Sequence, residues 1–340
     1  MDKEVERQID LIRERCVSIK PKVVIRCLTY NHQDYIADTL KGFINQNTDF
    51  PFVAIVHDDA SNDKTSSIIK RFAEEYPHII LPIYELENQY SKQNGSVGKV
   101  VNLACILTNA DYIAMCEGDD FWIDSNKLQK QVDFLESHKE YGMCYTKVRR
   151  LKQETGCLID EWGGPNTTFK QLLVKNTIPT PTTLFRMDLY RNYLKEIEPA
   201  NKAWKMGDYP LWLYISLNSK ILFFNEISAV YRILGSSGSH NKSLSKTLAF
   251  RKNFFSIGKF FIEYSKIVLS KKEKDDITKA KLFELIPIAL VLDDKDVLKE
   301  ARNFYKYNKK SVREFLLLNL SLLTKYCLLL KYKRNGYSIN

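Results

Sequence analysis

A glycine flanked by three carboxylates, Glu117, Asp119 and Asp120, is the stretch of this sequence best suited to chemistry. The residues before it form a short apolar run typical of a buried strand in an α/β sheet. Residues that can cap a helix follow, and apolar residues at helical spacing come next. Carboxylates crowded at the end of a strand repel one another, so such a cluster persists mainly where a cation lies between them. An isolated aspartate pair would favour a solvated turn, but the strand and helix around this one favour a ligand site.

Polar loops also follow two earlier runs of strand type. Residues 23–28 are largely β-branched and apolar, and they end in the loop 29–31, Thr-Tyr-Asn. Residues 52–57 form a second such run and end in the acidic loop 58–63. Because the carboxyl ends of parallel strands meet at one edge of a sheet, we expect the acidic residues of both loops at the same edge.

The spacing of apolar residues predicts helices between these strands. We expect a leader helix over residues 1–20, a third strand over 79–84, a strand over 112–116, and a helix with Val100, Leu103, Ala104 and Leu107 on one face. Strands that alternate with helices predict an α/β fold, with a largely parallel sheet and helices on both faces.

The second half of the chain is less regular. We expect a strand at 143–148, turns over 160–181, an extended segment at 181–185, and short strands at 221–225 and 229–231. Residues 206–215 predict a helix with Asp208 at its start and Pro210 in its first turn, where proline is tolerated. A flexible loop at 235–240 precedes a helical, lysine-rich region from about residue 243 to 335.

Composition describes a folded protein, with 44% hydrophobic and 27% charged residues among 340. The seven cysteines form no CxxC pair. Because we find no secretory leader, we expect reduced thiols in a cytoplasmic protein. No run approaches the roughly 18 uninterrupted apolar residues that a membrane-spanning helix needs.

The net charge of +10 is concentrated near the carboxyl end. From Asn241 onward the charge is about +12, which suggests an anionic partner for this tail. Phospholipid and nucleic acid are both anionic, and excess lysine also serves solubility alone. We predict an anionic membrane surface, at the inner face of the plasma membrane, and no nucleic acid. The apolar stretch 315–330, followed by Lys331, Lys333 and Arg334, fits either a membrane interface or a helix packed on the body.

In order along the chain, these segments resemble the family 2 glycosyltransferases of bacterial type, an inverting group with the GT-A fold. Residues 23–31 are similar to the family's opening strand, although Leu28 replaces the usual proline, and Gln46 follows at the expected distance. Residues 58–63 resemble its Asp-Asp-Gly-Ser-x-Asp segment, with Ala60 in place of glycine.

Two later motifs complete the resemblance. Residues 117–122 lie where the family carries its metal-binding Asp-x-Asp equivalent. Residues 207–212 resemble the motif whose aspartate serves as base, with Gly207 in place of the common glutamate. Each motif alone is weak, but four in the right order are specific. The similarity covers roughly residues 21–235 and implies a Rossmann-like GT-A sheet followed by a C-terminal helical region.

The resemblance implies roles in binding the donor. Asp59 would accept a hydrogen bond from the nucleotide base. Thr29, Tyr30 and Asn31 would flank the base and ribose, and Asp119 would also line the nucleotide site.

It also implies a metal site and a base. Asp120, helped by Asp119, would hold Mg²⁺ or Mn²⁺ against the diphosphate, and His240 is a further candidate ligand because its loop could fold over the diphosphate. Asp208 would deprotonate the acceptor hydroxyl as it attacks the anomeric carbon. One in-line displacement of this kind inverts the anomeric configuration.

The predicted function is transfer of a sugar from a nucleoside-diphosphate sugar, most simply a UDP-sugar, to a saccharide or lipid-linked acceptor in surface polysaccharide synthesis. We divide the chain into a leader helix (1–20), a glycosyltransferase domain (21–240, with its nucleotide-sugar half at 21–122 and its acceptor half at 123–240) and a basic helical region (241–340). Two alternatives remain open: a non-catalytic nucleotide-sugar-binding scaffold of the same fold, and a sugar-phosphate nucleotidyltransferase. The second would need a glycine-rich, arginine-containing loop after the first strand, which residues 29–32 do not provide.

Overall fold

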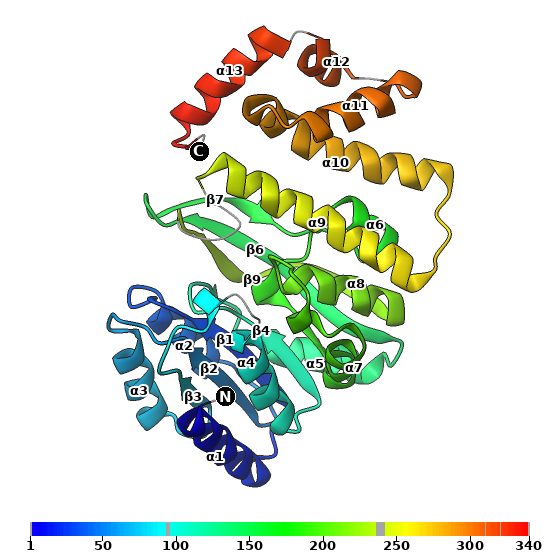
Figure 1. Ribbon diagram of the computed structural model, residues 1–340. Helices are drawn as coiled ribbons and strands as arrows, with labels where there is room; N and C mark the ends of the chain where they lie inside the picture. The colour runs from blue at the N-terminus through cyan, green and yellow to red at the C-terminus, as the bar shows by residue number, and fades with distance from the viewer. Residues whose placement is uncertain (1, 93–95, 236–241, 310, 320, 339–340) are drawn as a thin grey trace. The chain divides into compact units, whose positions relative to one another are not determined.

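The computed structural model describes residues 2–92, 96–235, 242–309, 311–319 and 321–338 (Figure 1). The chain forms two compact units. The first comprises Met1–Thr168, Thr177–Ala203 and Tyr214–Arg232, and the second comprises Phe169–Asn176, Trp204–Leu213 and Ile233–Asn340.

Within the described residues, nine strands form one sheet in the order β3-β2-β1-β4-β8-β6-β9-β5, with β7 paired to β6. Their bounds are β1 Val23–Thr29, β2 Phe52–Asp58, β3 Ile80–Tyr84, β4 Tyr112–Met115, β5 Phe121–Trp122, β6 Tyr141–Lys152, β7 Cys157–Trp162, β8 Leu184–Arg186 and β9 Lys220–Ile233. The strand β1 pairs in parallel with β2 and β4, and β2 pairs in parallel with β3. The pairs that β5, β7 and β8 form are antiparallel, so the sheet is mixed.

The helices of the first unit cover the sheet on both faces, as predicted. They are α1 Lys3–Ile19, α2 Ile36–Ile44, α3 Thr65–Glu75, α4 Ser96–Leu107, α5 Lys127–Ser137 and α7 Met187–Ile197. Alternate residues of β1, from Val23 to Cys27, join a core with α2, α3 and α5. The residues between them face the other way, where the Arg26 side chain meets Asn102 of α4. All seven residues of β2 are buried, as expected for a strand covered on two faces.

The leader helix α1 protects the open edge of the sheet. Its residues Val5, Ile9 and Ile12 are buried, which confirms the predicted amphipathic helix. The side-chain amide of Gln8 donates to the carbonyl oxygen of Tyr84 at 3.2 Å and accepts from the backbone N–H of Tyr84 at 2.8 Å. These two bonds satisfy backbone groups of the edge strand β3 that would otherwise be available to pair with another chain.

Three sequence expectations are wrong in detail. The two short strands predicted at 221–225 and 229–231 are one continuous strand, β9. The turns predicted over 160–181 contain the end of β7 and the helix α6, Phe169–Val174. In α4, Leu103 is 39% exposed, because Val101 and Cys105 lie on the buried side beside Val100.

The second unit is helical. Its further helices are α9 Leu244–Ser265, α10 Lys271–Leu292, α11 Lys295–Tyr307, α12 Val312–Asn319 and α13 Ser321–Arg334, and it also holds the start of α8, Asp208–Asn218. A capping box between Ser270 and Glu273 begins α10. Residues 285–291 of α10 are buried in an apolar core that α9, α11 and α12 share. The predicted helical region is therefore confirmed.

Candidate active site

The end of β1 holds two polar loops together. The backbone N–H of Asp59 donates to the carbonyl oxygen of Thr29 at 3.0 Å, and the N–H of Gly118 donates to the carbonyl oxygen of Leu28 at 2.8 Å. Asp59 follows β2, whereas Gly118 lies in the acidic turn after β4. The structure thus brings the predicted residues Thr29, Asp59 and Asp120 to one edge of the sheet. This edge is formed by the carboxyl ends of the parallel strands, where open α/β sheets bind their ligands.

The three carboxylates of the acidic turn differ in their roles. Glu117 is a structural residue: its carboxylate accepts from the backbone N–H of Leu28 at 2.9 Å and pairs with the buried Arg26 guanidinium at 3.3 Å. Asp119 is half-buried, and Asp120 is only 3% exposed. Two carboxylates, and not three, are therefore left for a cation.

Asp120 is held in a setting that disfavours its own charge. Burial, followed by the neighbouring charge of Asp119, raises the pKa of the Asp120 carboxyl well above its usual value. Its Oδ1 atom accepts the backbone N–H of Arg232 at 2.8 Å. The Thr39 hydroxyl donates to the carbonyl oxygens of Gly118, at 3.0 Å, and of Asp120, at 2.6 Å. The carboxylate is fixed in place, and a bound cation would offset the cost of its charge.

Arg232 is a component of the site that sequence reasoning missed. Its guanidinium donates to the carbonyl oxygen of Asp119 at 2.7 Å and to the carboxylate of Asp38 at 2.5 Å. It also lies over the ring of Phe121, 4.4 Å from the ring centroid. A charged residue within the apolar run 229–233 was the available signal, since a buried arginine needs partners.

Gly118 allows a close approach that no other residue would allow. A Cβ atom at this position would lie 2.6 Å from Thr29 Cβ and 3.0 Å from His32 Nδ1. Thr29 Oγ1 and His32 Nδ1 are both buried without a hydrogen-bond partner. The acidic turn therefore packs directly on the end of β1.

Asp59 is buried and caps the segment that follows β3. Its Oδ1 accepts the backbone N–H of Gln89 at 2.7 Å, and its Oδ2 accepts that of Tyr90, at the start of the short helix η1 (Tyr90–Lys92), at 3.0 Å. The side chain of Asn31 accepts the N–H of Asn62 at 3.0 Å and so links the two loops. Tyr30 is 42% exposed. Contact of these residues with a nucleotide stays a prediction.

Asp208 belongs to the second unit, where it begins α8 as predicted. Its carboxylate accepts the N–H of Tyr209 at 2.7 Å. Tyr209 anchors this helix start: its ring stacks on Phe254 at 4.0 Å, and its hydroxyl donates to the carbonyl oxygen of Leu172 at 3.2 Å. The catalytic role of Asp208 stays a prediction, and His240, the further candidate metal ligand, lies outside the described residues.

Among the described residues, no group of three or more His, Cys, Asp or Glu side chains is arranged to hold a metal ion. Two hard carboxylate ligands, Asp119 and Asp120, nonetheless suit Mg²⁺ or Mn²⁺. Magnesium is typically bound by one or two carboxylates, with water and substrate phosphates completing its coordination.

Comparison with known proteins identifies the family. The model of glycosyl transferase family 2 matches residues 27–194, a range that contains Thr29, Asp59 and the acidic turn. The chain belongs to glycosyl transferase family 2.

Relatives of this family 2 chain occur in several bacteria. The "Uncharacterized protein Rv1520" of Mycobacterium tuberculosis is 34% identical over 213 residues, which are 60% of this chain and 57% of the relative. The match thus spans little more than half of that protein. The "Putative teichuronic acid biosynthesis glycosyltransferase TuaG" of Bacillus subtilis is 25% identical over 264 residues, which are 74% of this chain and 98% of the relative.

A solved structure confirms the family 2 fold. The crystal structure of S. aureus TarS 1-349 in complex with UDP-GlcNAc is similar with a TM-score of 0.59, at 17% sequence identity, over 94% of this chain and 93% of that one. The predicted class, a GT-A-type α/β fold with a C-terminal helical region, is therefore confirmed.

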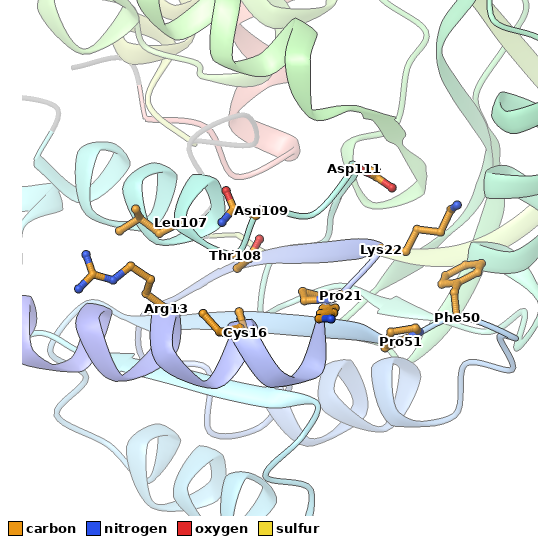
Figure 2. Close-up of a pocket in the computed structure, with 12 residues that line it drawn as sticks. Arg13, Cys16, Pro21, Lys22, Phe50, Pro51, Leu107, Thr108, Asn109 and Asp111 are labelled. Carbon is orange, nitrogen blue, oxygen red and sulfur yellow. The ribbon is translucent and has the colours of Figure 1, made fainter.

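A cavity of about 490 Å³ lies at the opposite edge of the family 2 domain (Figure 2). It is lined by residues that precede β1, β2 and β4, among them Lys22, Pro51 and Asp111. Its lining contains none of the predicted site residues, and Lys22 is already paired with Glu136 at 3.1 Å. Because ligands of open α/β sheets bind at the carboxyl ends of the strands, the acidic edge is the stronger candidate.

Proposed function

We propose that this chain transfers a sugar from a nucleoside-diphosphate sugar to a hydroxyl group of a saccharide or lipid-linked acceptor, with inversion at the anomeric carbon. The observation that carries the proposal is that Asp59 and the acidic turn that contains Asp120 both bond to the end of β1, within the range that the family model matches. The similar TarS structure is a complex with UDP-GlcNAc, which supports a UDP-sugar as donor. The name of TuaG supports a place in surface polysaccharide synthesis.

The residues at the sheet edge would bind and orient the donor. Asp59 would accept a hydrogen bond from the base, and Tyr30 would lie against the nucleoside. Asp119 and Asp120 would hold Mg²⁺ or Mn²⁺, which when bound supplies positive charge against the departing diphosphate. Arg232 would keep both carboxylates in position through its bonds to the acidic turn.

Asp208 would act on the acceptor. It would take the proton of the acceptor hydroxyl as that oxygen forms a bond to the anomeric carbon. The bond from that carbon to the diphosphate oxygen would break on the opposite face, and the nucleoside diphosphate would leave with the electron pair.

Thermal unfolding in the presence of nucleotide sugars tests the proposal. UDP, UDP-glucose, UDP-GlcNAc and GDP-mannose would each be added with MnCl₂ or with EDTA. A ligand at 100 times its dissociation constant stabilises the native state by about 2.7 kcal/mol. We expect a rise in the melting temperature with at least one donor, dependent on the metal, followed by slow donor hydrolysis. Binding without hydrolysis or transfer would favour the non-catalytic scaffold, and no binding at all would contradict the proposal.

A further inference from the structure

The last helix of the second unit, α13, carries apolar residues on two opposite faces. Three of them are partly buried and pack against the unit's core: Leu328, Leu329 and Tyr332. Leu323, Tyr326 and Leu330 recur at helical spacing on the other face, where they are 66%, 61% and 51% exposed. A helix at a water-exposed surface normally carries polar residues on its outer face.

The preceding helix, α12, repeats this arrangement. Its residues Leu317 and Leu318 are buried in the same core. Val312, Phe315 and Leu316 are exposed and lie on the opposite side of the helix by their spacing. The packed-helix and the membrane-interface alternatives of the sequence analysis therefore do not exclude each other, because one face of each helix packs and the other remains free for a partner.

We call the exposed apolar residues of the two helices the outward face: Val312, Phe315, Leu316, Leu323, Tyr326 and Leu330. Single exposed apolar residues need no explanation, but six large ones on two consecutive helices indicate an interaction surface. The charge beside them indicates the kind of partner. Lys331, Lys333 and Arg334 are exposed in the last turn of α13. Residues 311–340 contain five Lys or Arg and one Glu, a net charge of five minus one, or +4.

We propose that the outward face binds the interface of an anionic lipid bilayer, with α12 and α13 lying in the plane of the surface. Exposed apolar side chains next to a basic cluster are typical of helices that insert one face among lipid headgroups. In the parts of the chain that the structure describes, no single helix has the length and apolarity to cross a bilayer. One bent pair of helices, residues 312–319 and 323–334, reaches that length and apolarity when the two are taken together, and they meet at 104°.

This inference does not depend on the proposed transferase activity, because it concerns residues of the second unit alone. It would place the protein at the inner face of the plasma membrane. A second copy of the chain is the other occupant that an apolar face admits, but the basic cluster on each copy would oppose that pairing.

Sedimentation of the full-length chain with vesicles tests the proposal. Vesicles of phosphatidylcholine with about 30% phosphatidylglycerol would be compared with phosphatidylcholine alone. Deletion of residues 311–340 is a poor variant, because it removes Leu317 and Leu318 from the core. The double variant Leu323→Gln/Leu330→Gln changes only exposed side chains. We expect it to lose at least about tenfold in apparent affinity for the anionic vesicles.

The matched control is Leu158→Gln/Ile159→Gln on β7, whose side chains are 55% and 52% exposed. We expect it to bind vesicles like the wild type. The triple variant Lys331→Gln/Lys333→Gln/Arg334→Gln should lose the preference for phosphatidylglycerol and the sensitivity to salt. Three results would overturn the proposal: no sedimentation of the wild type with anionic vesicles, equal binding by the Leu323→Gln/Leu330→Gln variant, or a wild-type dimer that this variant dissociates while neither protein binds vesicles.

Discussion

Arg232 donates its backbone N–H to the buried carboxylate of Asp120 at 2.8 Å, although 112 residues separate the two in sequence. The strand β9 thereby fixes the acidic turn that follows β4. The Arg232 side chain reinforces this contact through the carbonyl oxygen of Asp119. The predicted metal ligands are thus oriented by a residue that carries no ligand atom of its own.

Arg232→Met should weaken donor use without unfolding the protein. The variant keeps the backbone bond to Asp120 but loses the guanidinium bonds to Asp119 and Asp38. Residues that orient metal ligands typically contribute 10–100-fold, so we expect the Michaelis constant for the donor to rise by roughly that factor. Steady-state kinetics at several Mn²⁺ concentrations would measure it. Asp38→Asn is the control, because it removes only the half-exposed end of the ion pair. Equal defects in both variants would mean that Arg232 acts through Asp38 alone.

Asp120→Asn should abolish metal-dependent nucleotide binding yet stabilise the fold in EDTA. The folded-state pKa of the Asp120 carboxyl is raised, so its ionisation costs stability as pH rises above the unfolded value of about 4. Asparagine keeps an acceptor for Arg232 and has no such cost. We expect the variant's advantage in unfolding free energy to grow by about 1 kcal/mol per pH unit above pH 4, until the folded-state pKa is passed.

Glu117→Gln is the contrasting variant in the same turn. It weakens the pair with the buried Arg26, so it should lower the free energy of unfolding by about 1–3 kcal/mol. Denaturant titrations of both variants in EDTA would show opposite signs if the acidic turn divides its roles in this way. A destabilised Asp120→Asn would contradict the assignment of that carboxylate to a cation.

Asp59→Ala should raise the Michaelis constant for the donor much more than it lowers turnover, as expected when uniform binding is lost. The structure adds a second effect, since the carboxylate also holds the backbone N–H groups of Gln89 and Tyr90. Asn88→Ala separates the two, because it loosens the same segment by removing its bond to the Asp59 carbonyl oxygen while keeping the carboxylate. A donor defect in Asn88→Ala as large as in Asp59→Ala would assign the effect to the segment and not to recognition of the base.

Lys127 should make the stability of the first unit depend on pH. It is 1% exposed, and burial lowers the pKa of its ammonium group from 10.5 to about 7. Its Nζ atom donates to Gln131 at 2.8 Å and lies 4.2 Å from the ring centroid of Trp122, whose π face opposes the shift. Between pH 7 and about 10 the unfolded chain binds a proton that the folded chain does not, so stability rises with pH.

The expected slope from this group is at most about 1.4 kcal/mol per pH unit. Unfolding in guanidinium chloride at pH 7.5, 8.5 and 9.5 would measure it as the difference between the wild type and Lys127→Met, which has no titrating group there. Lys130→Met, at a neighbouring but half-exposed position, should keep the wild-type slope. Parallel curves for the wild type and Lys127→Met would show that Lys127 stays charged in the folded protein.

The sequence was sufficient to predict helices and strands that are determined by residues close together in the chain. The spacing of Val5, Ile9 and Ile12 predicted the leader helix, and the Gly207-Asp208 turn predicted the start of α8. The continuity of β9 was missed because Glu226 interrupts its apolar pattern, whereas pairing with a neighbouring strand carries the backbone through. Such pairing depends on residues far away in the chain, which a local window does not contain.

The residues of the candidate site also fall into those that the sequence could predict and those that it could not. Asp120 was accessible to prediction because a carboxylate after a buried strand is visible in the sequence. The roles of Glu117 and Arg232 were not, since each depends on a partner about 90 or more residues away, Arg26 for the first and Asp120 for the second. The burial of Leu103 was wrongly expected for a related reason: the spacing gave a helix, but packing chose which of its faces is covered.

Asp208 is the residue on which the proposed mechanism turns. If it is the base, Asp208→Asn should reduce turnover by roughly 10²–10⁴-fold while leaving donor binding unchanged. Asparagine is also favoured at helix starts, so the fold should be preserved. A structural role alone would predict no kinetic defect of this kind.

The chain provides a matched control in Asp188. This residue lies in the first turn of α7, and its carboxylate accepts the N–H of Leu189 at 2.7 Å, the distance that joins Asp208 to Tyr209. Asp188→Asn should therefore reproduce any local effect on a helix start without touching the chemistry. We expect normal glycosyl transfer from Asp188→Asn and a severe turnover defect from Asp208→Asn, measured with the donor and acceptor that the binding panel identifies. Near-normal turnover in Asp208→Asn would mean that Asp208, like Asp188, serves only to hold the start of its helix.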